Sequence, residues 1–300
     1  IMNISQTNIA KPIIVELPNK QLAPLVVSSP HSGSNYPQDF VEKSALSKMK
    51  LRSSEDCFVD EIFSQAPEIG VPLLKALFPR VFVDVNRGPF ELDPAMFDTA
   101  LPDYVTTKNQ RIFAGLGTVA KVVSNGEEIY KQRLNFDDVK KRIETYYNPY
   151  HLELKKLVET TRNIFGFCIL LDCHSMPSNA ARSAAPKPFG KKGVDIILGD
   201  CHGSSCHPSI MNTALESLTK AGFSVRRNNP YAGGFITQHY GKPYENVHAI
   251  QIEINRSLYM NEKVLERLNE INELTQIMTD FMKDMGQKLD PMAHFKGAAE

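Results

Sequence analysis

The chain has 300 residues, of which 42% are hydrophobic and 23% charged, the proportions of a globular protein that can bury a full core. Lys and Arg together number 34, as do Asp and Glu, so the charge balance does not indicate binding to nucleic acid or to an anionic membrane surface. No apolar run approaches the roughly 20 residues that span a bilayer, and the N-terminal residues do not resemble a signal peptide.

Short apolar runs alternate with helical patterns along the chain. In chain order, we expect a strand at about 24–29, a helix near 55–66, a strand at 81–85, a helix near 136–162, strands at 165–171 and 194–199, a helix near 209–221, strands at 223–227 and 248–254, and a helix at 261–285. Pro149 is expected to kink or split the second of these helices. The alternation predicts a single α/β catalytic domain over residues 1–300, with three α/β/α layers around a mostly parallel or mixed sheet.

Polar side chains follow or end four of these apolar runs. His31 follows PLVVSSP, Asn86 and Arg87 follow VFVDV, His174 follows FGFCILLDC, and Glu253 lies in HAIQIEI. Open α/β sheets bind their ligands at the carboxyl ends of the strands. The pattern therefore predicts an enzyme cleft at one edge of the sheet.

Two histidines among these residues, His31 and His174, are candidate metal ligands, because neutral imidazole is a common ligand of zinc. A carboxylate is the natural third ligand, and the segment SSEDCFVDE (53–61) offers four acids: Glu55, Asp56, Asp60 and Glu61. The spacing is not a zinc signature such as H-E-x-x-H. Each histidine alone also fits a hydrogen-bonded structural role, so the pattern leaves the metal open.

Glu253 interrupts an apolar run, and burial there would raise its pKa toward that of a general base. The alternative is a structural ion pair with Arg256. Arg80, Asn86 and Arg87 flank the 81–85 run, where arginine forks could bind a carboxylate or stabilise an oxyanion.

The chain has five cysteines, an odd number whose spacing fits neither a disulfide framework nor a C-x-x-C zinc site. A reducing compartment, and therefore a cytoplasmic protein, is the simplest interpretation. Cys173 and His174 could in principle form a nucleophilic pair, but adjacent strand residues point to opposite faces. The stretch 175–193, rich in Ser, Ala, Pro and Gly, is expected to be a lid-like loop beside the site.

Taken together, six segments resemble the N-formylglutamate amidohydrolase family over about residues 22–262. They are SPHSG (29–33), SEDCFVDEI (54–62), RVFVDVNRG (80–88), LLDCHSMPS (170–178), DIILGD (195–200) and NPYAGGFITQHYGKPYENVHAIQIEINRSLYM (229–260). The family looks related to zinc carboxypeptidases and aspartoacylases, so the resemblance implies a phosphorylase/hydrolase-like α/β/α fold and one Zn²⁺ per chain.

The same resemblance implies roles for individual residues. His31, His174 and Asp56, in preference to Glu55, would be the zinc ligands, although the wider group has an H-x-x-E pattern and this chain has Ser34 at that position. Glu253 would act as general base and acid, and Arg80 would polarise the scissile carbonyl. The residues implied to bind the carboxylate of an anionic N-acyl amino acid are Asn86, Arg87 and Arg256.

The reaction implied is the hydrolysis of N-formyl-L-glutamate to formate and L-glutamate, a step in histidine degradation. Three alternatives remain from the residues: a zinc hydrolase of another N-acyl amino acid or peptide, a thiol enzyme using Cys173, and a non-catalytic metal-binding protein. The oligomeric state is not predicted.

Overall fold

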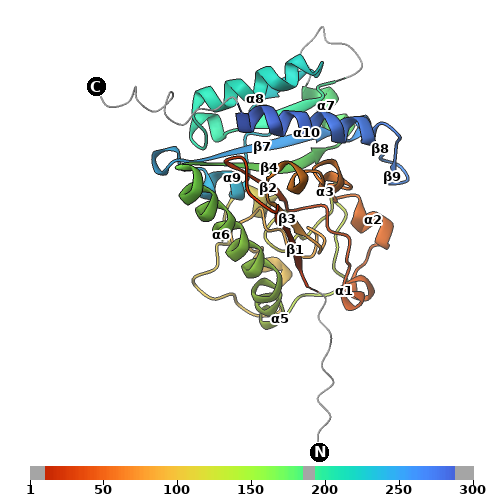
Figure 1. Ribbon diagram of the computed structural model, residues 1–300. Coiled ribbons are helices and arrows are strands. Elements are labelled where there is room, and N and C mark those ends of the chain that lie inside the picture. The colour runs from red at the N-terminus through yellow and green to blue at the C-terminus, as the bar shows by residue number, and fades with distance from the viewer. Residues whose placement is uncertain (1–10, 185–192, 288–300) are drawn as a thin grey trace, which may run out of the picture.

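The computed structural model describes residues 11–184 and 193–287, and its centre is a seven-stranded sheet in the order β1-β3-β2-β4-β7-β5-β6 (Figure 1). β3, β2, β4 and β7 run parallel to one another, whereas β1, β5 and β6 run in the opposite direction. The strands are β1 (Ile13–Glu16), β2 (Leu25–Ser29), β3 (Leu73–Ala76), β4 (Cys168–Met176), β5 (Ile196–Gly199), β6 (Val225–Arg227) and β7 (Val247–Asn255).

Helices cover both faces of the sheet, which gives the three-layer α/β/α arrangement. Figure 1 shows α8 (Pro208–Lys220) and α10 (Ile271–Gln287) on one side and α6 (Asn148–Phe165) on the other. The remaining helices are α1 (Gln38–Lys43), α2 (Lys48–Arg52), α3 (Val59–Ile62), α4 (Gln110–Phe113), α5 (Phe136–Arg142), α7 (Ser178–Ala184) and α9 (Phe235–Tyr240). The predicted fold class is confirmed; the extent of the single domain over 1–300 stays a prediction.

Side chains of β4 alternate between two cores, because successive strand residues point to opposite faces. Leu171 and Cys173 join the cluster formed with α3, α8 and α10. Leu170 joins the cluster formed with α6 and α9. His174 therefore lies on the α6 side of the sheet, two residues beyond Asp172 on the same face.

The strand predicted at 81–85 is wrong. The segment is buried but irregular: the N–H groups of Phe82 and Val83 both donate to the Pro79 carbonyl, at 2.9 and 3.3 Å. The sheet strand in this region is β3, which lies upstream. A short buried apolar run has the composition of a strand whatever its backbone, and here the run forms a buried turn.

The strand predicted at 165–171 begins and ends later than expected. Phe165 is the last residue of α6, and β4 continues through Met176 because pairing with β7 extends to Met176↔Asn255. His174 is thus inside a strand rather than after it. Of the lid-like loop predicted at 175–193, Ser178–Ala184 forms α7, and residues 185–192 lie outside the described residues.

The helices predicted at 209–221 and 136–162 are found, the latter as α5, a π-helical turn (Ile143–Tyr147) and α6. Pro149 is the second residue of α6, which directly follows the π-helical turn, where the hydrogen-bonding pattern of the helix changes. None of the helices in the described part of the chain is long and apolar enough to cross a membrane.

Two helices are shorter than predicted. In 55–66 only α3 is regular, because the Asp56 N–H donates to the His31 carbonyl (3.0 Å) instead of joining a helix. In 261–285 the helix begins at Ile271. The residues before it form a hairpin of β8 (Met260–Asn261) and β9 (Glu266–Arg267).

Candidate metal centre and active site

Three buried side chains from separate segments meet at the carboxyl edge of β2 and β4. His31 lies two residues after β2, His174 lies in β4, and Asp56 is attached to His31 through the backbone hydrogen bond described above. The Nδ1 atoms of the two histidines are 3.1 Å apart, and Asp56 Oδ2 lies 3.3 Å from His31 Nδ1 and 3.0 Å from His174 Nδ1. Together they form a group that could hold a metal ion.

The far nitrogen of each histidine is bound to a further carboxylate. His31 Nε2 is 2.7 Å from Asp84 Oδ1, and His174 Nε2 is 3.0 Å from Asp172 Oδ2. With Nε2 of each ring facing a carboxylate, both Nδ1 atoms face Asp56, where a cation could be bound. Three acceptor atoms at such short separations repel one another unless a proton or a cation lies among them.

The donor set fits zinc. Zinc–nitrogen bonds of 2.0–2.1 Å in a tetrahedral site imply ligand atoms about 3.3 Å apart, close to the three distances observed. Two imidazoles and one carboxylate also form a set found in catalytic zinc sites, which leaves a fourth position open.

The electrostatics of this group favour an ionised carboxylate. Burial tends to raise the pKa of Asp56, but hydrogen bonds from His174 and His31 and the charge of Arg80 outweigh it and hold the pKa well below its usual value. Burial alone would lower the pKa of His174, but Asp172 and Asp56 raise it well above 6.5. These shifts favour an ionised Asp56 beside a protonated His174.

Glu253 lies on β7 as the direct partner of His174 in the parallel β4–β7 pair. Its side chain is only 7% exposed, and its Oε1 accepts a hydrogen bond from Gln251 Nε2 (2.9 Å). Burial raises the pKa of Glu253 from 4.5 to about 7. Among the described residues it has no ion pair with Arg256, whose Nη2 instead lies 3.2 Å from Asp56 Oδ1.

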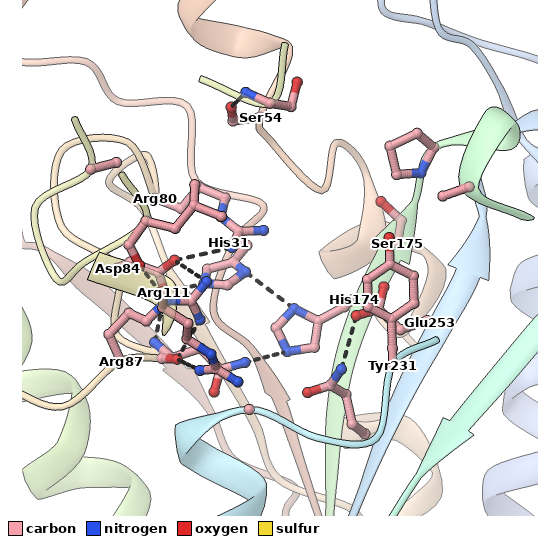
Figure 2. Close-up of a pocket in the computed structure, with 18 of the residues that line it drawn as sticks. His31, Ser54, Arg80, Asp84, Arg87, Arg111, His174, Ser175, Tyr231 and Glu253 are labelled. Atoms are coloured by element: carbon pink, nitrogen blue, oxygen red, sulfur yellow. Dashed lines mark hydrogen bonds and ion pairs between the residues drawn. The ribbon is translucent and has the colours of Figure 1, made fainter. Parts of the chain in front are cut away.

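A cavity of about 580 Å³ opens on these side chains, and four arginines line it. Figure 2 shows Arg80, Arg87 and Arg111 together on one side of the histidine pair and Glu253 on the other. Arg80 is paired with Asp84 (3.0 Å) and lies 3.8 Å from Asp56, so it adjoins the two carboxylates that contact His31.

The side chain of Asn86, at the wall of the cavity, contacts other residues of the site. Its Oδ1 accepts the Ile236 N–H at the start of α9 (2.8 Å), and its Nδ2 lies 3.3 Å from His174 Nε2. Gly234 passes so close that a Cβ there would overlap the Asn86 side chain. Gly234 therefore lets the backbone of the 229–234 turn approach Asn86.

Two candidates from the predicted segments, Glu55 and Cys173, do not reach the centre. Glu55 points away and is bound by Tyr36 Oη (2.7 Å) and Arg52 Nε (3.1 Å). Cys173 faces the opposite core, where burial raises the pKa of its thiol well above the usual value. A thiolate paired with His174 is therefore excluded by geometry.

Asp84, Tyr231 and Arg111 of the site were not singled out from the sequence. Asp84 carried a signal, since it is a charge inside an apolar run, as is Asp172, two residues before His174 on one strand face. Tyr231 lies in an irregular segment and Arg111 in the short helix α4, and neither segment has such a pattern.

The α/β sheet thus brings a group that could hold a metal ion, His31, Asp56 and His174, next to an arginine-lined cavity that contains a buried glutamate, an arrangement typical of hydrolases. Residues 23–260 match the profile of the N-formylglutamate amidohydrolase family. Because this match covers most of the chain, the protein belongs to that family, whose members hydrolyse an amide bond.

Individual relatives agree with this assignment. The chain is 29% identical to an N-formylglutamate deformylase of Pseudomonas putida over 80% of this chain and 82% of the relative, and 28% identical to one of Pseudomonas aeruginosa over 80% and 83%. The crystal structure of an N-formylglutamate amidohydrolase from Ralstonia eutropha JMP134 superposes with a TM-score of 0.86 at 34% identity, covering 93% of this chain and 98% of that one. A gene product from Agrobacterium tumefaciens shares the fold, with a TM-score of 0.62 and 18% identity.

Proposed function

We propose that the protein is a zinc-dependent hydrolase that cleaves N-formyl-L-glutamate to formate and L-glutamate. The observation that carries the proposal is the convergence of two Nδ1 atoms and Asp56 Oδ2 beside the buried Glu253. The names of the relatives support the substrate. A role in histidine degradation follows from that substrate.

In this mechanism His31, Asp56 and His174 would hold the zinc ion, which would supply Lewis acidity at the formyl carbonyl. The carboxylates of Asp84 and Asp172 keep the two imidazoles in the tautomer that presents Nδ1, which is the tautomer the ion needs.

Glu253 moves the proton. Its carboxylate accepts a proton from the attacking water, and the same carboxyl group then donates that proton to the nitrogen of the departing amine as the C–N bond breaks. With a pKa of about 7, both protonation states of Glu253 are accessible near neutral pH. Arg80 lines the same cavity and provides positive charge for the oxyanion that develops on the carbonyl oxygen.

The cavity volume supports one alternative substrate class. A space of about 580 Å³ also accommodates acyl groups larger than formyl, so other N-acyl amino acids are the second candidate substrates. A panel of N-formyl-, N-acetyl- and N-propionyl-L-glutamate distinguishes the two, because the proposal expects formyl to have the highest kcat/KM.

The decisive experiment measures zinc content and formate release on the same sample. We expect about one zinc per chain, formate release from N-formyl-L-glutamate, loss of that release on chelation, and recovery on adding Zn²⁺. Hydrolysis that survives complete removal of metal would refute the zinc mechanism. Bound zinc without formate release would refute the substrate and favour the second candidate.

We also propose a cytoplasmic location. All five cysteines have free thiols, and four of them are buried. This state fits a reducing compartment.

A further inference from the structure

Three of the four arginines that line the cavity are already engaged by the protein. Arg80 pairs with Asp84. Arg256 donates to Asp56, to Ser175 Oγ and to the Ser53 carbonyl.

Arg87 is engaged most completely. Its Nε donates to the Leu116 carbonyl and its Nη1 to the Asn86 carbonyl, both at 2.7 Å, and its Nη2 lies 3.8 Å from Asp84. Its side chain is about 10% exposed. Arg87 therefore braces the backbone at the cavity wall and has few donors left for a ligand.

Arg111 differs from these three. Its nearest acceptors are two backbone carbonyls at long distances, Asn86 at 3.5 Å and Gly233 at 3.4 Å. Within residues 11–184 and 193–287, no carboxylate oxygen lies within 4.0 Å of its guanidinium. It is half-buried, and it lines the cavity beside Arg87 (Figure 2). A cation at a partly desolvated position without an anionic partner is suited to an anionic ligand.

The backbone that carries Arg111 is anchored to the rest of the site. Asn109 caps α4 by accepting the Ile112 N–H (2.8 Å), and its Nδ2 donates to Glu91 Oε2 (3.0 Å). Glu91 Oε1 in turn accepts the N–H of Gly88, the residue after Arg87 (2.9 Å). This chain of contacts holds α4 against the turn that forms the cavity wall, so the guanidinium is positioned before a ligand arrives.

We propose that Arg111 binds a carboxylate of the substrate and selects dicarboxylic N-acyl amino acids. The inference rests on the proposed function and refines it: Arg111, rather than Arg87, supplies the free guanidinium fork. A planar guanidinium can bind a carboxylate through two parallel N–H···O bonds, an arrangement that a neutral amide does not reproduce.

The test compares Arg111→Met with the matched control Lys108→Met, each in the otherwise unchanged chain and with zinc bound. Lys108 lies three residues away and does not line the cavity, so its replacement removes the same charge without the contact. Three substrates are used: N-formyl-L-glutamate, N-formyl-L-glutamine, in which the side-chain carboxylate is neutral, and N-formyl-L-isoglutamine, in which the α-carboxylate is neutral.

We expect Arg111→Met to raise KM for N-formyl-L-glutamate about 10- to 100-fold with little change in kcat, the pattern of lost ground-state binding. The penalty should vanish for one of the two amides, which identifies the carboxylate that Arg111 holds. Lys108→Met should behave as wild type. An unchanged KM, or an equal loss for all three substrates, would overturn the proposal.

A binding measurement separates this inference from the proposed reaction. Glutarate has two carboxylates and no amide, so its affinity, measured by calorimetry, does not depend on turnover. Weaker glutarate binding by Arg111→Met but not by Lys108→Met supports the role of Arg111 even if the wild type releases no formate. Equal affinity in both variants, or no binding of glutarate by the wild type, would refute it.

Discussion

Replacing Glu253 by glutamine tests the proposed mechanism most directly, because it removes the proton acceptor and keeps the shape of the side chain. General acid–base catalysis contributes on the order of 10²–10⁴ in rate, so formate release should fall by about that factor. The zinc content should stay near that of the wild type, since Glu253 is not among the three converging ligands.

The same substitution should change stability in a pH-dependent way. Burial raises the pKa of Glu253 from 4.5 to about 7, so between these pH values the native state keeps a proton that the unfolded chain releases. Wild-type stability therefore falls as pH rises through this window. At about 1.4 kcal/mol per pKa unit, the fall attributable to Glu253 is about 3 kcal/mol above pH 7. The glutamine side chain of the variant does not titrate, so the stability of the variant should not show this decrease with pH.

Urea unfolding of the metal-free proteins measures this difference. We expect Glu253→Gln to match the wild type in its pH dependence below pH 4.5 and to gain about 3 kcal/mol over it above pH 7. A stability difference that does not vary with pH would show that Glu253 titrates normally. Turnover at the wild-type rate would remove Glu253 as the general base.

Three further substitutions probe the residues around it. His174→Ala should lose both zinc and activity, and stoichiometric zinc in the purified variant would exclude His174 as a ligand. Asp172→Asn should weaken zinc binding about 10- to 100-fold, because the partner that orients His174 loses its charge; competition with a chelator measures this, and unchanged affinity would contradict the role of Asp172. Cys173→Ala should keep wild-type kcat and KM, since its thiol faces the opposite core, whereas a severe loss of turnover would revive the thiol mechanism.

The layers of the fold could be predicted from the sequence because buried side chains recur with the period of the helix or strand that carries them. The runs at 24–29 and 248–254 correspond closely to β2 and β7, and 209–221 to α8. The run at 81–85 misled for a physical reason: tertiary burial selects apolar side chains in an irregular turn as strongly as in a strand.

The sequence also identified the segments that meet at the site but not the partners within it. His31 and His174 could be chosen by residue type, and Asp56 was preferred among four acids only with the family resemblance. The structure brings the ligand atoms of these three residues within 3.3 Å of one another. The guanidinium of Arg87 donates to backbone carbonyls, whereas that of Arg111 makes only long contacts with them. This difference depends on the course of the chain over residues 88–134. No periodic pattern encodes such contacts.

The register of one strand pair connects the chemistry with the stability of the fold. Pairing of His174 with Glu253 places both side chains on the α6 side of the sheet, and it places Cys173 and Ile252 together in the apolar core on the other side. A slip of one residue would exchange these faces: the charged side chains would enter the apolar core and the apolar ones would face the cavity. The hydrophobic residues of β4 and β7 thus hold the proposed ligand and the proposed base in register, and the core packing that stabilises the sheet also positions the site.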